Sequence, residues 1–503
     1  MAKINIGISK QMPGSFKGEW LILLLSSDSR DLSGEIKELD AQYGNLISGV
    51  FASGEFKGKT SEIYKFNLPQ GLPVGRMILS GIGPKSALDA EIIRKSAAAA
   101  VRLTGSVSGH IGILLPVLAG GNSVRDYLSA GLEGALLSLY RFDKYKSKDK
   151  DNVAKRKKVS KITILLPGVG DPARYESVIK ETESICNAVY YGRDLINLPG
   201  NEFSTQSLVD EARKLGKHPS VKIEILRRDK LKKMGMKAIL AVGGGSQSPP
   251  FLIVIEYRGG RKGERPLALI GKGVTFDSGG ITLKDGPKME EMKQDMAGAA
   301  VVISTISAIA QLKIPINIIA LVPAVENMPS GKSYRPGDII RTHSGITVEV
   351  LSTDAEGRLI IADALSYSKR FNPTAVIDIA TLTGAARIAL GTVGCAVLGH
   401  DDDLVGKIID ASARTGEKVW RLPLWPEFDK RLESYIADLK NTGGSDGGTI
   451  VAGKFLSKFI EGYRWAHLDI ANVDYAHSDG DYWREGATGF GIRLLIDVVR
   501  NWK

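Results

Sequence analysis

Cysteine is scarce in this chain, which contains only Cys186 and Cys395 among its 503 residues. Two thiols can form one disulfide at most, so a fold held together by several disulfides is excluded. We expect both to be reduced structural thiols of a cytoplasmic protein. The first residues, MAKINIGISKQMPGSF, lack an apolar core followed by small residues, which argues against a secretory leader.

Long hydrophobic runs are also missing. Stretches such as WLILLLSS (20–27) have the length of a strand, whereas a helix that spans a bilayer requires about 20 predominantly apolar residues. We therefore expect no contact with a membrane. The composition, 43% hydrophobic and 24% charged, is that of an ordinary soluble globular protein. The length predicts two domains, because single cores rarely grow beyond about 250–300 residues.

Several common catalytic motifs are absent. NMPSGKS ends like a phosphate-binding loop, but Glu326 stands where its first glycine belongs, and GKGVTF lacks the third glycine of a dinucleotide fingerprint. Neither HExxH nor GxSxG occurs. The histidines have no metal-ligand spacing. They are His110, His218, His343, His400, His467 and His477. Any metal ion would therefore have to be held by other residue types.

Charge of one sign is in moderate excess, with a formal net charge of +11. Part of this excess lies in the basic stretch KYKSKDKDNVAKRKKVSK, residues 144–161. A solvated loop is the simpler interpretation, and nucleic-acid binding is the alternative, because basic clusters attract phosphate regardless of sequence. No aromatic residues interleave the cluster at 155–158, so base stacking is not indicated.

Strand-like and helix-like segments alternate along the chain, which predicts layered α/β domains. In the first third, short apolar runs at 20–27, 75–83, 110–117 and 161–168 alternate with helical patterns at 86–105 and 124–142. A long helical pattern follows at 174–200. We predict an N-terminal α/β domain at 1–172, a linking helix at 173–192 and a C-terminal domain at 193–503.

The C-terminal domain has longer apolar strands. They are VKIEILRR, FLIVIEYRG, PLALIGKGV, INIIALVPAV, AVIDIATLTG and WAHLDIANV. Such continuous apolar strands indicate a sheet that is covered by helices on both faces.

Polar clusters interrupt these strands. Their members are Lys272, Asp277 and Lys284; Asp295; and Asp354, Glu356 and Arg358. Asp354 and Glu356 lie two residues apart, so in an extended segment both carboxylates point to the same side and repel each other unless a cation or proton lies between them. The four carboxylates carry a charge of −4, which two divalent cations would balance. Lys272 then fits as a neutral amine ligand, because desolvation and a neighbouring dication both lower its pKa.

These motifs resemble those of the leucyl aminopeptidase (cytosol aminopeptidase) family of dinuclear metallopeptidases. The matching segments are GKGVTFDSGG, DMAGAA, TDAEGRL, DIATLTGA and WAHLDIA, which together extend over nearly all of the C-terminal domain. The N-terminal domain is similar in layout. The resemblance implies a smaller, macro-like N-terminal α/β domain and a larger C-terminal α/β/α sandwich with a mixed sheet.

The resemblance also implies roles for individual residues. Asp277 and Glu356 would bridge two divalent ions (Mn²⁺ or Zn²⁺), Lys272 and Asp295 would complete the shell of one ion, and Asp354 that of the other. Lys284 and Arg358 would be the catalytic cations, with a bicarbonate ion possible at Arg358. The implied substrate-binding residues are Met292, Thr381, Leu382, Thr383 and Gly384.

The implied activity is removal of unsubstituted N-terminal residues, leucine and similar ones preferred, from peptides during intracellular protein turnover, by a metal-bridged water. The implied assembly is a homo-hexamer, a dimer of trimers, in the cytoplasm. Two positions depart from the pattern of the family: Ser352 replaces a frequent asparagine and Asn472 a frequent glycine, which leaves the side-chain preference open. Two alternatives remain, a nucleic-acid-binding protein, suggested by the basic stretch, and a dinuclear phosphoesterase, which usually adds histidine ligands.

Overall fold

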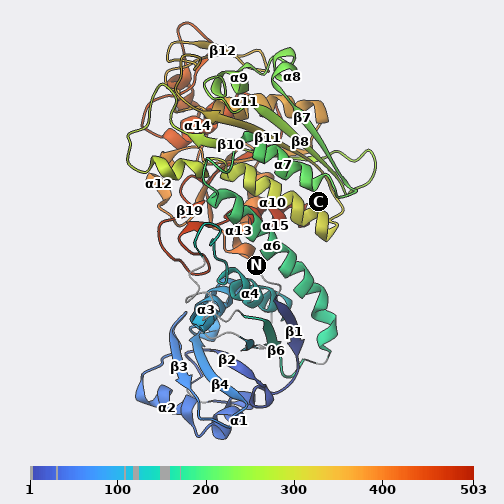
Figure 1. Cartoon of the computed structure of the whole chain (residues 1–503), viewed down its shortest axis with the longest axis vertical. Coiled ribbons are helices and arrows are strands. Elements are labelled where there is room, and N and C mark those ends of the chain that lie inside the picture. The colour runs from blue at the N-terminus through green and yellow to red at the C-terminus, as the bar shows by residue number, and fades with distance from the viewer. Residues whose placement is uncertain are drawn as a thin grey trace. The chain divides into compact units, whose positions relative to one another are not determined.

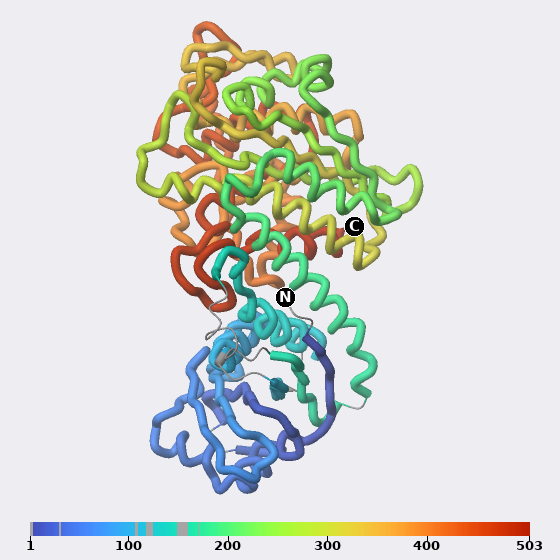
Figure 2. Tube along the Cα trace, viewed as in Figure 1, coloured from blue at the N-terminus to red at the C-terminus, as the bar shows by residue number. Residues whose placement is uncertain are grey.

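A computed structural model describes residues 4–29, 32–106, 109–116, 124–147, 159–169 and 171–502. The chain forms two compact units, an N-terminal unit (Met1–Cys186 with Ser478–Glu485) and a C-terminal unit (Asn187–His477 with Gly486–Lys503). Helix α6 (Glu176–Asn197), green in Figure 2, leads from one unit into the other. Residues 148–158 of the predicted basic stretch lie outside the described residues, and the domain boundaries at 172 and 193 stay predictions.

The N-terminal unit is built on a six-stranded sheet with the order β1-β6-β5-β2-β4-β3. Among the described strands of this sheet, β3 alone runs antiparallel to its neighbour. The strands are β1 (Asn5–Ser9), β2 (Gly18–Leu25), β3 (Ile63–Asn67), β4 (Val74–Gly81), β5 (His110–Leu114) and β6 (Lys161–Leu165). The four predicted strands are confirmed as β2, β4, β5 and β6. The two edge strands, β1 and β3, were not predicted, because their side chains are only partly buried and their sequences are less apolar.

Helices cover both faces of this sheet (Figure 1). Leu39 of α1 and Phe51 of α2 share an apolar cluster with Leu23 of β2 and Leu79 of β4. On the other face, the Ser96 hydroxyl of α3 donates to the carbonyl oxygen of Gly81 at 2.7 Å. The helices are α1 (Gly34–Gln42), α2 (Leu46–Ser53), α3 (Ala90–Arg102) and α4 (Val124–Leu137). The predicted N-terminal α/β domain is therefore confirmed.

The segment Ser478–Glu485 belongs to the N-terminal unit although it is distant in sequence. The Arg102 guanidinium donates to the carbonyl oxygens of Gly480 and Asp481, the latter at 2.7 Å. Lys95 forms an ion pair with the Asp481 carboxylate at 3.0 Å, and the Tyr482 hydroxyl donates to Glu91 at 3.3 Å. Helix α3 is thus held by residues that follow most of the C-terminal unit in the chain.

The C-terminal unit is built on a mixed sheet with the order β16-β15-β18-β14-β9-β11-β8-β7, and β10 also pairs with β11. Its centre is parallel: β18, β14, β9, β11 and β10 run in one direction, whereas β8 and β15 are antiparallel to their neighbours β11 and β18. The strands are β7 (Val221–Leu226), β8 (Phe251–Arg258), β9 (Leu267–Gly271), β10 (Gly273–Asp277), β11 (Asn317–Asn327), β14 (Ala375–Ala380), β15 (Cys395–Gly399), β16 (Val419–Arg421) and β18 (Trp465–Asp469). The mixed sheet is as predicted.

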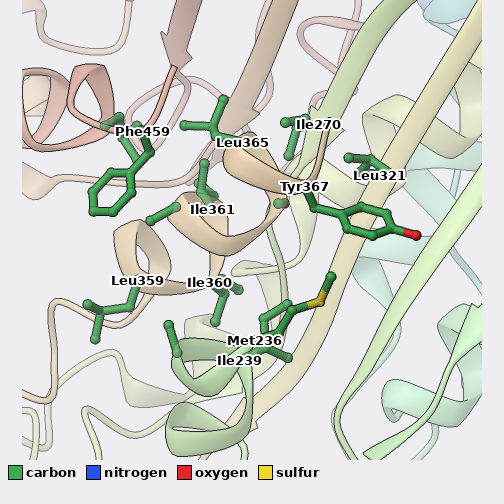
Figure 3. Close-up of a cluster of buried hydrophobic side chains, with 14 of the residues drawn as sticks. Met236, Ile239, Ile270, Leu321, Leu359, Ile360, Ile361, Leu365, Tyr367 and Phe459 are labelled. Carbon is green, nitrogen blue, oxygen red and sulfur yellow. The ribbon is translucent and has the colours of Figure 1, made fainter. Parts of the chain in front are cut away.

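Helices cover both faces of this sheet too. One layer contains α7 (Thr205–Leu215), α10 (Ala297–Leu312), α13 (Asp402–Thr415) and α15 (Ile492–Arg500), and the other contains α9 (Lys237–Val242), α11 (Gly357–Ser368) and α14 (Gly448–Ser457). Figure 3 shows how α11 fills the second layer: its residue Ile360 lies close to Ile239 of α9, within a cluster that includes Ile270 of β9 and Leu321 of β11. This burial explains why α11 carries apolar residues on all sides.

One segment in the described part of the chain, Met289–Leu312, is long and apolar enough to cross a membrane. The expectation that no stretch approaches this length is therefore wrong for this segment. It contains α10, and 83% of its apolar window is buried within the fold. Its apolar character is that of a core helix packed against β9, β11 and β14.

Two glycines let α10 approach the sheet closely. A Cβ atom on Gly298 would lie 2.2 Å from the carbonyl oxygen of Ile379, and one on Gly271 would lie 2.4 Å from the carbonyl oxygen of Gly298. The first turn of α10 therefore rests on the backbone of β9 and β14. Because β9, β10, β11, β14 and β18 are parallel, their carboxyl ends meet at one edge of the sheet, where α/β proteins usually bind ligands. Of the predicted site residues, Lys272 follows β9, Asp277 ends β10 and Thr381 follows β14.

Candidate metal centre

Lys272 directly follows β9 and is almost fully buried. Its Nζ atom donates to Asp295 Oδ1 at 2.7 Å and to the carbonyl oxygen of Thr381 at 2.9 Å, and it lies 2.8 Å from Glu356 Oε1. Gly357, the first residue of α11, makes room for this side chain, since a Cβ atom there would lie 2.5 Å from Lys272 Cε. The DAEGR motif therefore requires glycine at this position, because a larger residue would clash with Lys272.

Asp277 ends β10 and is held in place by backbone and side-chain donors. Its Oδ1 accepts from the N–H of Gly279 at 2.9 Å and from Asn327 Nδ2 at 2.8 Å. Gly279 and Gly280 have φ angles of +86° and +68°, which favour glycine, so the GG pair forms the turn that places an N–H beside Asp277. Asn327 was not predicted, because its only sign in the sequence is a polar residue at the end of an apolar strand.

Lys284 brings two of the carboxylates together. Its Nζ atom lies 2.7 Å from Asp277 Oδ2 and 2.5 Å from Asp354 Oδ1. Asp277, Asp354 and Glu356 each offer an oxygen atom, and these atoms all lie within 4.8 Å of one another. Asp277 and Glu356 are buried, whereas Asp354 is exposed to solvent. The predicted carboxylates thus converge from β10 and from the start of α11.

Electrostatics at this centre are dominated by burial of many charges. Burial raises the pKa of Asp295 and Glu356, and the neighbouring carboxylates raise it further, while Lys272 opposes both shifts. Burial by itself lowers the pKa of Lys272 and Lys284, but the surrounding carboxylates outweigh it and raise both above the ordinary lysine value. The buried carboxylates therefore strongly stabilise positive charge that lies among them.

Asp295, which follows the short helix η5 (Met289–Gln294), is only partly satisfied by its neighbours. Its Oδ1 accepts from Lys272 and from the Thr381 hydroxyl at 2.7 Å, but its buried Oδ2 has no hydrogen-bond partner among the described residues. An unpartnered carboxylate oxygen beside converging acidic side chains is suited to a divalent cation. The residues present therefore fit the metal ions that the sequence predicts.

Arg358, in the first turn of α11, is buried behind the carboxylates. Its Nη1 donates to the carbonyl oxygen of Asn441 at 2.9 Å, and its Nε has no partner in the described part of the chain. Burial lowers the pKa of Arg358 to about 10, although Glu356, Asp469 and Asp354 act in the opposite direction. The free N–H makes Arg358 able to hold an anion.

The predicted substrate-binding residues lie in two segments. Thr381, Leu382 and Thr383 follow β14, Gly384 begins α12 (Gly384–Leu390), and Met292 is half-buried in η5. Thr381 contacts both Asp295 and Lys272, which joins this loop to the carboxylate cluster.

Asp469 at the end of β18 fixes this loop and was given no role from the sequence. Its Oδ1 accepts from the N–H groups of Leu382 at 3.1 Å and Thr383 at 3.3 Å, and its Oδ2 accepts from the Thr383 hydroxyl at 2.6 Å. It occurs in the matching motif WAHLDIA, but its function depends on a partner from a distant segment. Sequence spacing carries no such signal.

A second buried charged pair lies deeper in the same sheet. His467 Nδ1 is 2.6 Å from Asp378 Oδ1, and Trp465 Nε1 donates to Asp378 Oδ2 at 2.7 Å. Burial alone would lower the pKa of His467, but the Asp378 carboxylate outweighs it and raises the pKa above the ordinary histidine value. This pair is enclosed within strands β14 and β18 and serves the fold.

The two α/β units and the buried carboxylate–lysine centre at the strand ends define a metal-dependent hydrolase. The chain belongs to the cytosol aminopeptidase family: residues 190–496 match the catalytic domain of that family and residues 22–149 match its N-terminal domain. It is a metal-dependent aminopeptidase, as the motifs of the sequence predict.

Similar proteins agree with this assignment. The chain is 44% identical over 465 residues to a probable cytosol aminopeptidase of Syntrophotalea carbinolica, covering 92% of this chain and 93% of the relative. It is 40% identical over 502 residues to that of Azotobacter vinelandii, covering 99% of each.

Solved structures with the same fold include a mutant of tomato leucine aminopeptidase, with a TM-score of 0.89, 31% identity and coverage of 99% of this chain and 96% of that one. The bottromycin maturation enzyme BotP in complex with Mn has a TM-score of 0.83 and 31% identity, with coverage of 96% of this chain and 99% of that one.

Proposed function

We propose that this aminopeptidase releases unsubstituted N-terminal residues, leucine and similar ones among them, from peptides during protein turnover in the cytoplasm. The observation that carries the proposal is the convergence of Asp277, Asp354 and Glu356 within 4.8 Å, with the buried amine of Lys272 beside Glu356. The cytosol aminopeptidase relatives support the same activity.

Five residues would hold two divalent ions, Mn²⁺ or Zn²⁺. They are Lys272, Asp277, Asp295, Asp354 and Glu356. Oxygen-rich ligation with one amine suits either metal, and a related structure contains Mn. When bound, the ions supply an activated water and polarise the carbonyl group of the scissile peptide bond.

Lys272 would act as a ligand only in its neutral form. Its Nζ already lies against Asp295 and Glu356, which would hold the same ion, and Lys272 would release its proton to solvent when it becomes a ligand. Lys284 has a different role in this proposal. It lies between Asp277 and Asp354 and stays charged, so that it can donate a hydrogen bond to the oxyanion that forms from the peptide carbonyl.

Arg358 would bind a bicarbonate ion, which would supply a proton acceptor for the water. The buried guanidinium with an unpartnered Nε supports this part of the proposal. The loop that Asp469 holds, 381–384, would orient the first residue of the peptide together with Met292. By resemblance to the family, we also propose a homo-hexamer. Sedimentation of the active enzyme as a stable monomer would contradict that assembly.

The test uses metal-loaded protein and three substrates: leucine p-nitroanilide, N-acetyl-leucine p-nitroanilide and p-nitrophenyl phosphate. We expect cleavage of the first alone, because a free amino group is needed to bind the metal centre. Cleavage of the acetylated compound at a similar rate would contradict the proposed exopeptidase mechanism. Cleavage of the phosphate ester in place of the anilide would favour a phosphoesterase.

A further inference from the structure

The buried carboxyl group of Asp474 is only partly satisfied by the backbone N–H groups of Asp474 and Tyr475. Asp474 is 2% exposed, and its Oδ2 has no hydrogen-bond partner among the described residues. Its backbone is fixed, since its N–H donates to the carbonyl oxygen of Ile470 at 3.1 Å and its own carbonyl oxygen accepts from the N–H of Thr488 at 2.9 Å. The side chain is therefore held in a place where one of its oxygen atoms lacks a donor.

The side chain of Asn472, in the same turn, also has a buried acceptor without a donor. Asn472 uses its Nδ2 to donate to the carbonyl oxygens of Gly391 and Gly394, both at 2.7 Å. Its Oδ1 is buried and has no partner in the part of the chain that the structure describes. Two buried acceptors without donors, two residues apart, are rare in proteins because each loses its hydrogen bonds to water.

The turn that carries these acceptors runs along the predicted substrate-binding residues. It begins at Ile470, whose N–H donates to the carbonyl oxygen of Ala380 at 2.8 Å, directly before Thr381. Asn472 then contacts the end of α12. Beyond Asp474, His477 Nδ1 lies 3.3 Å from Glu291 of η5, the residue next to Met292. Asp474 is therefore placed among the elements that carry Thr381, Gly384 and Met292.

Charges of the metal centre also reach Asp474. Burial, together with the charge of Asp469, raises its pKa to about 8, although the backbone N–H groups of Asp474 and Tyr475 and the positive charge of Lys272 lower it. The carboxyl group thus lies close enough to the centre to be affected by it. A neutral acid near pH 7 tolerates an apolar neighbour, and a cation placed beside it favours the carboxylate.

We propose that Asp474, assisted by the Asn472 carbonyl oxygen, binds the basic side chain of an N-terminal lysine or arginine, so that the enzyme accepts basic residues beside leucine-like ones. An ammonium or guanidinium group has several N–H donors and a positive charge, which complement both orphan acceptors. A leucine side chain has no donor and leaves both unpartnered. This inference rests on the proposed function and specifies its substrate class.

The test compares Mn²⁺-loaded wild-type enzyme with Asp474→Asn and Asp474→Leu on lysyl, arginyl, leucyl and methionyl aminomethylcoumarin amides. We expect wild type to cleave the basic substrates, and the ratio of kcat/KM for lysyl to leucyl to fall at least about tenfold in Asp474→Leu, mainly through KM. Asp474→Asn, which has nearly the same shape, should lower the ratio less. Asp410→Asn, on the exposed side of α13, removes the same charge and should leave the ratio unchanged.

Either of two results would overturn the inference: no cleavage of lysyl and arginyl amides by an enzyme that cleaves the leucyl amide, or a ratio that changes less than twofold in both variants. The second result would mean that water satisfies the two acceptors. Failure to cleave any substrate would overturn the proposed function instead. Calorimetry with lysine amide and norleucine amide, which differ by one amino group, then decides the inference, and equal affinities would overturn it.

Discussion

The Nζ atom of Lys272 lies 2.8 Å from Oε1 of Glu356, and both side chains are 3% exposed. The pair joins the end of β9 to the start of α11, so the two sides of the metal centre depend on each other. A buried ion pair loses more when one partner is removed than it gains by forming, because the remaining charge is left without a partner. Substitutions at this centre should therefore show which residues bind metal and which act on the reaction in another way.

Lys272→Ala should weaken metal affinity first, and excess metal should restore part of the rate. Lys272→Arg should not restore activity, because a guanidinium group does not lose its proton to become a ligand. Metal stoichiometry measured beside steady-state rates checks both variants. A Lys272→Arg enzyme with two metals and full rate would exclude lysine ligation.

Lys284→Ala should lower kcat by roughly 10²- to 10³-fold, the usual effect of removing one oxyanion donor. Metal content should stay nearly unchanged, and excess metal should not rescue the rate. The same metal and rate measurements serve as the check. If excess metal did restore activity, Lys284 would be acting on metal binding through Asp277 and Asp354.

Asp354→Ala should abolish turnover while the fold survives, because Asp354 lies at the solvent-exposed side of the cluster. Glu356→Ala should also abolish turnover, and it should lower the melting temperature as well, since it leaves buried Lys272 with one carboxylate fewer. The exposed neighbour Asp285 provides the control, because Asp285→Ala removes a charge near the site without touching the cluster. Near wild-type rates in either cluster variant would contradict the dinuclear assignment.

Removal of metal by a chelator should abolish peptidase activity, and Mn²⁺ or Zn²⁺ should restore it. The carboxylates of the centre remain paired with two lysines, so circular dichroism should show that the fold persists. Residual activity is measured on leucine p-nitroanilide after the metal content is verified by mass spectrometry. Undiminished hydrolysis by metal-free protein would be incompatible with the proposed mechanism.

The pair of His467 and Asp378 should make stability depend on pH. The raised pKa of His467 means that the folded state binds its proton more tightly than the unfolded state does. Its contribution should be complete below the unfolded pKa of about 6.5 and should be lost as the pH rises through the folded value. Urea unfolding of wild type and His467→Gln from pH 5.5 to 9 should show a difference that shrinks as the pH rises. His218→Gln, at a partly exposed position just before β7, is the control, and a constant difference would mean that His467 is not protonated.

Much of the fold and most residues that converge at the candidate metal site could be predicted from the sequence, because the signals are local. Apolar runs marked the central strands, and charged residues at their ends, such as Lys272 and Asp277, stood out against them. The edge strands β1 and β3 gave weak signals since they are half-buried.

Asn327 and Asp469 were missed for another reason. Each acts through a partner from a distant segment, Asp277 for Asn327 and the backbone of Leu382 for Asp469, and neither pairing leaves a trace in sequence spacing. The apolar residues of α10 were underestimated because polar serines and threonines interrupt them, although the helix is buried as a whole.

The N-terminal unit consists of two separate segments of the chain, because Ser478–Glu485 packs with residues 1–186. A fragment that stops at Cys186 would lack the carbonyl groups that accept from Arg102 and the carboxylate that pairs with Lys95. Expression of the first 186 residues alone should therefore give a less stable product than the unit within the whole protein. An excised version should be made by circular permutation or by grafting the eight-residue segment through a linker, so that α3 keeps its partners.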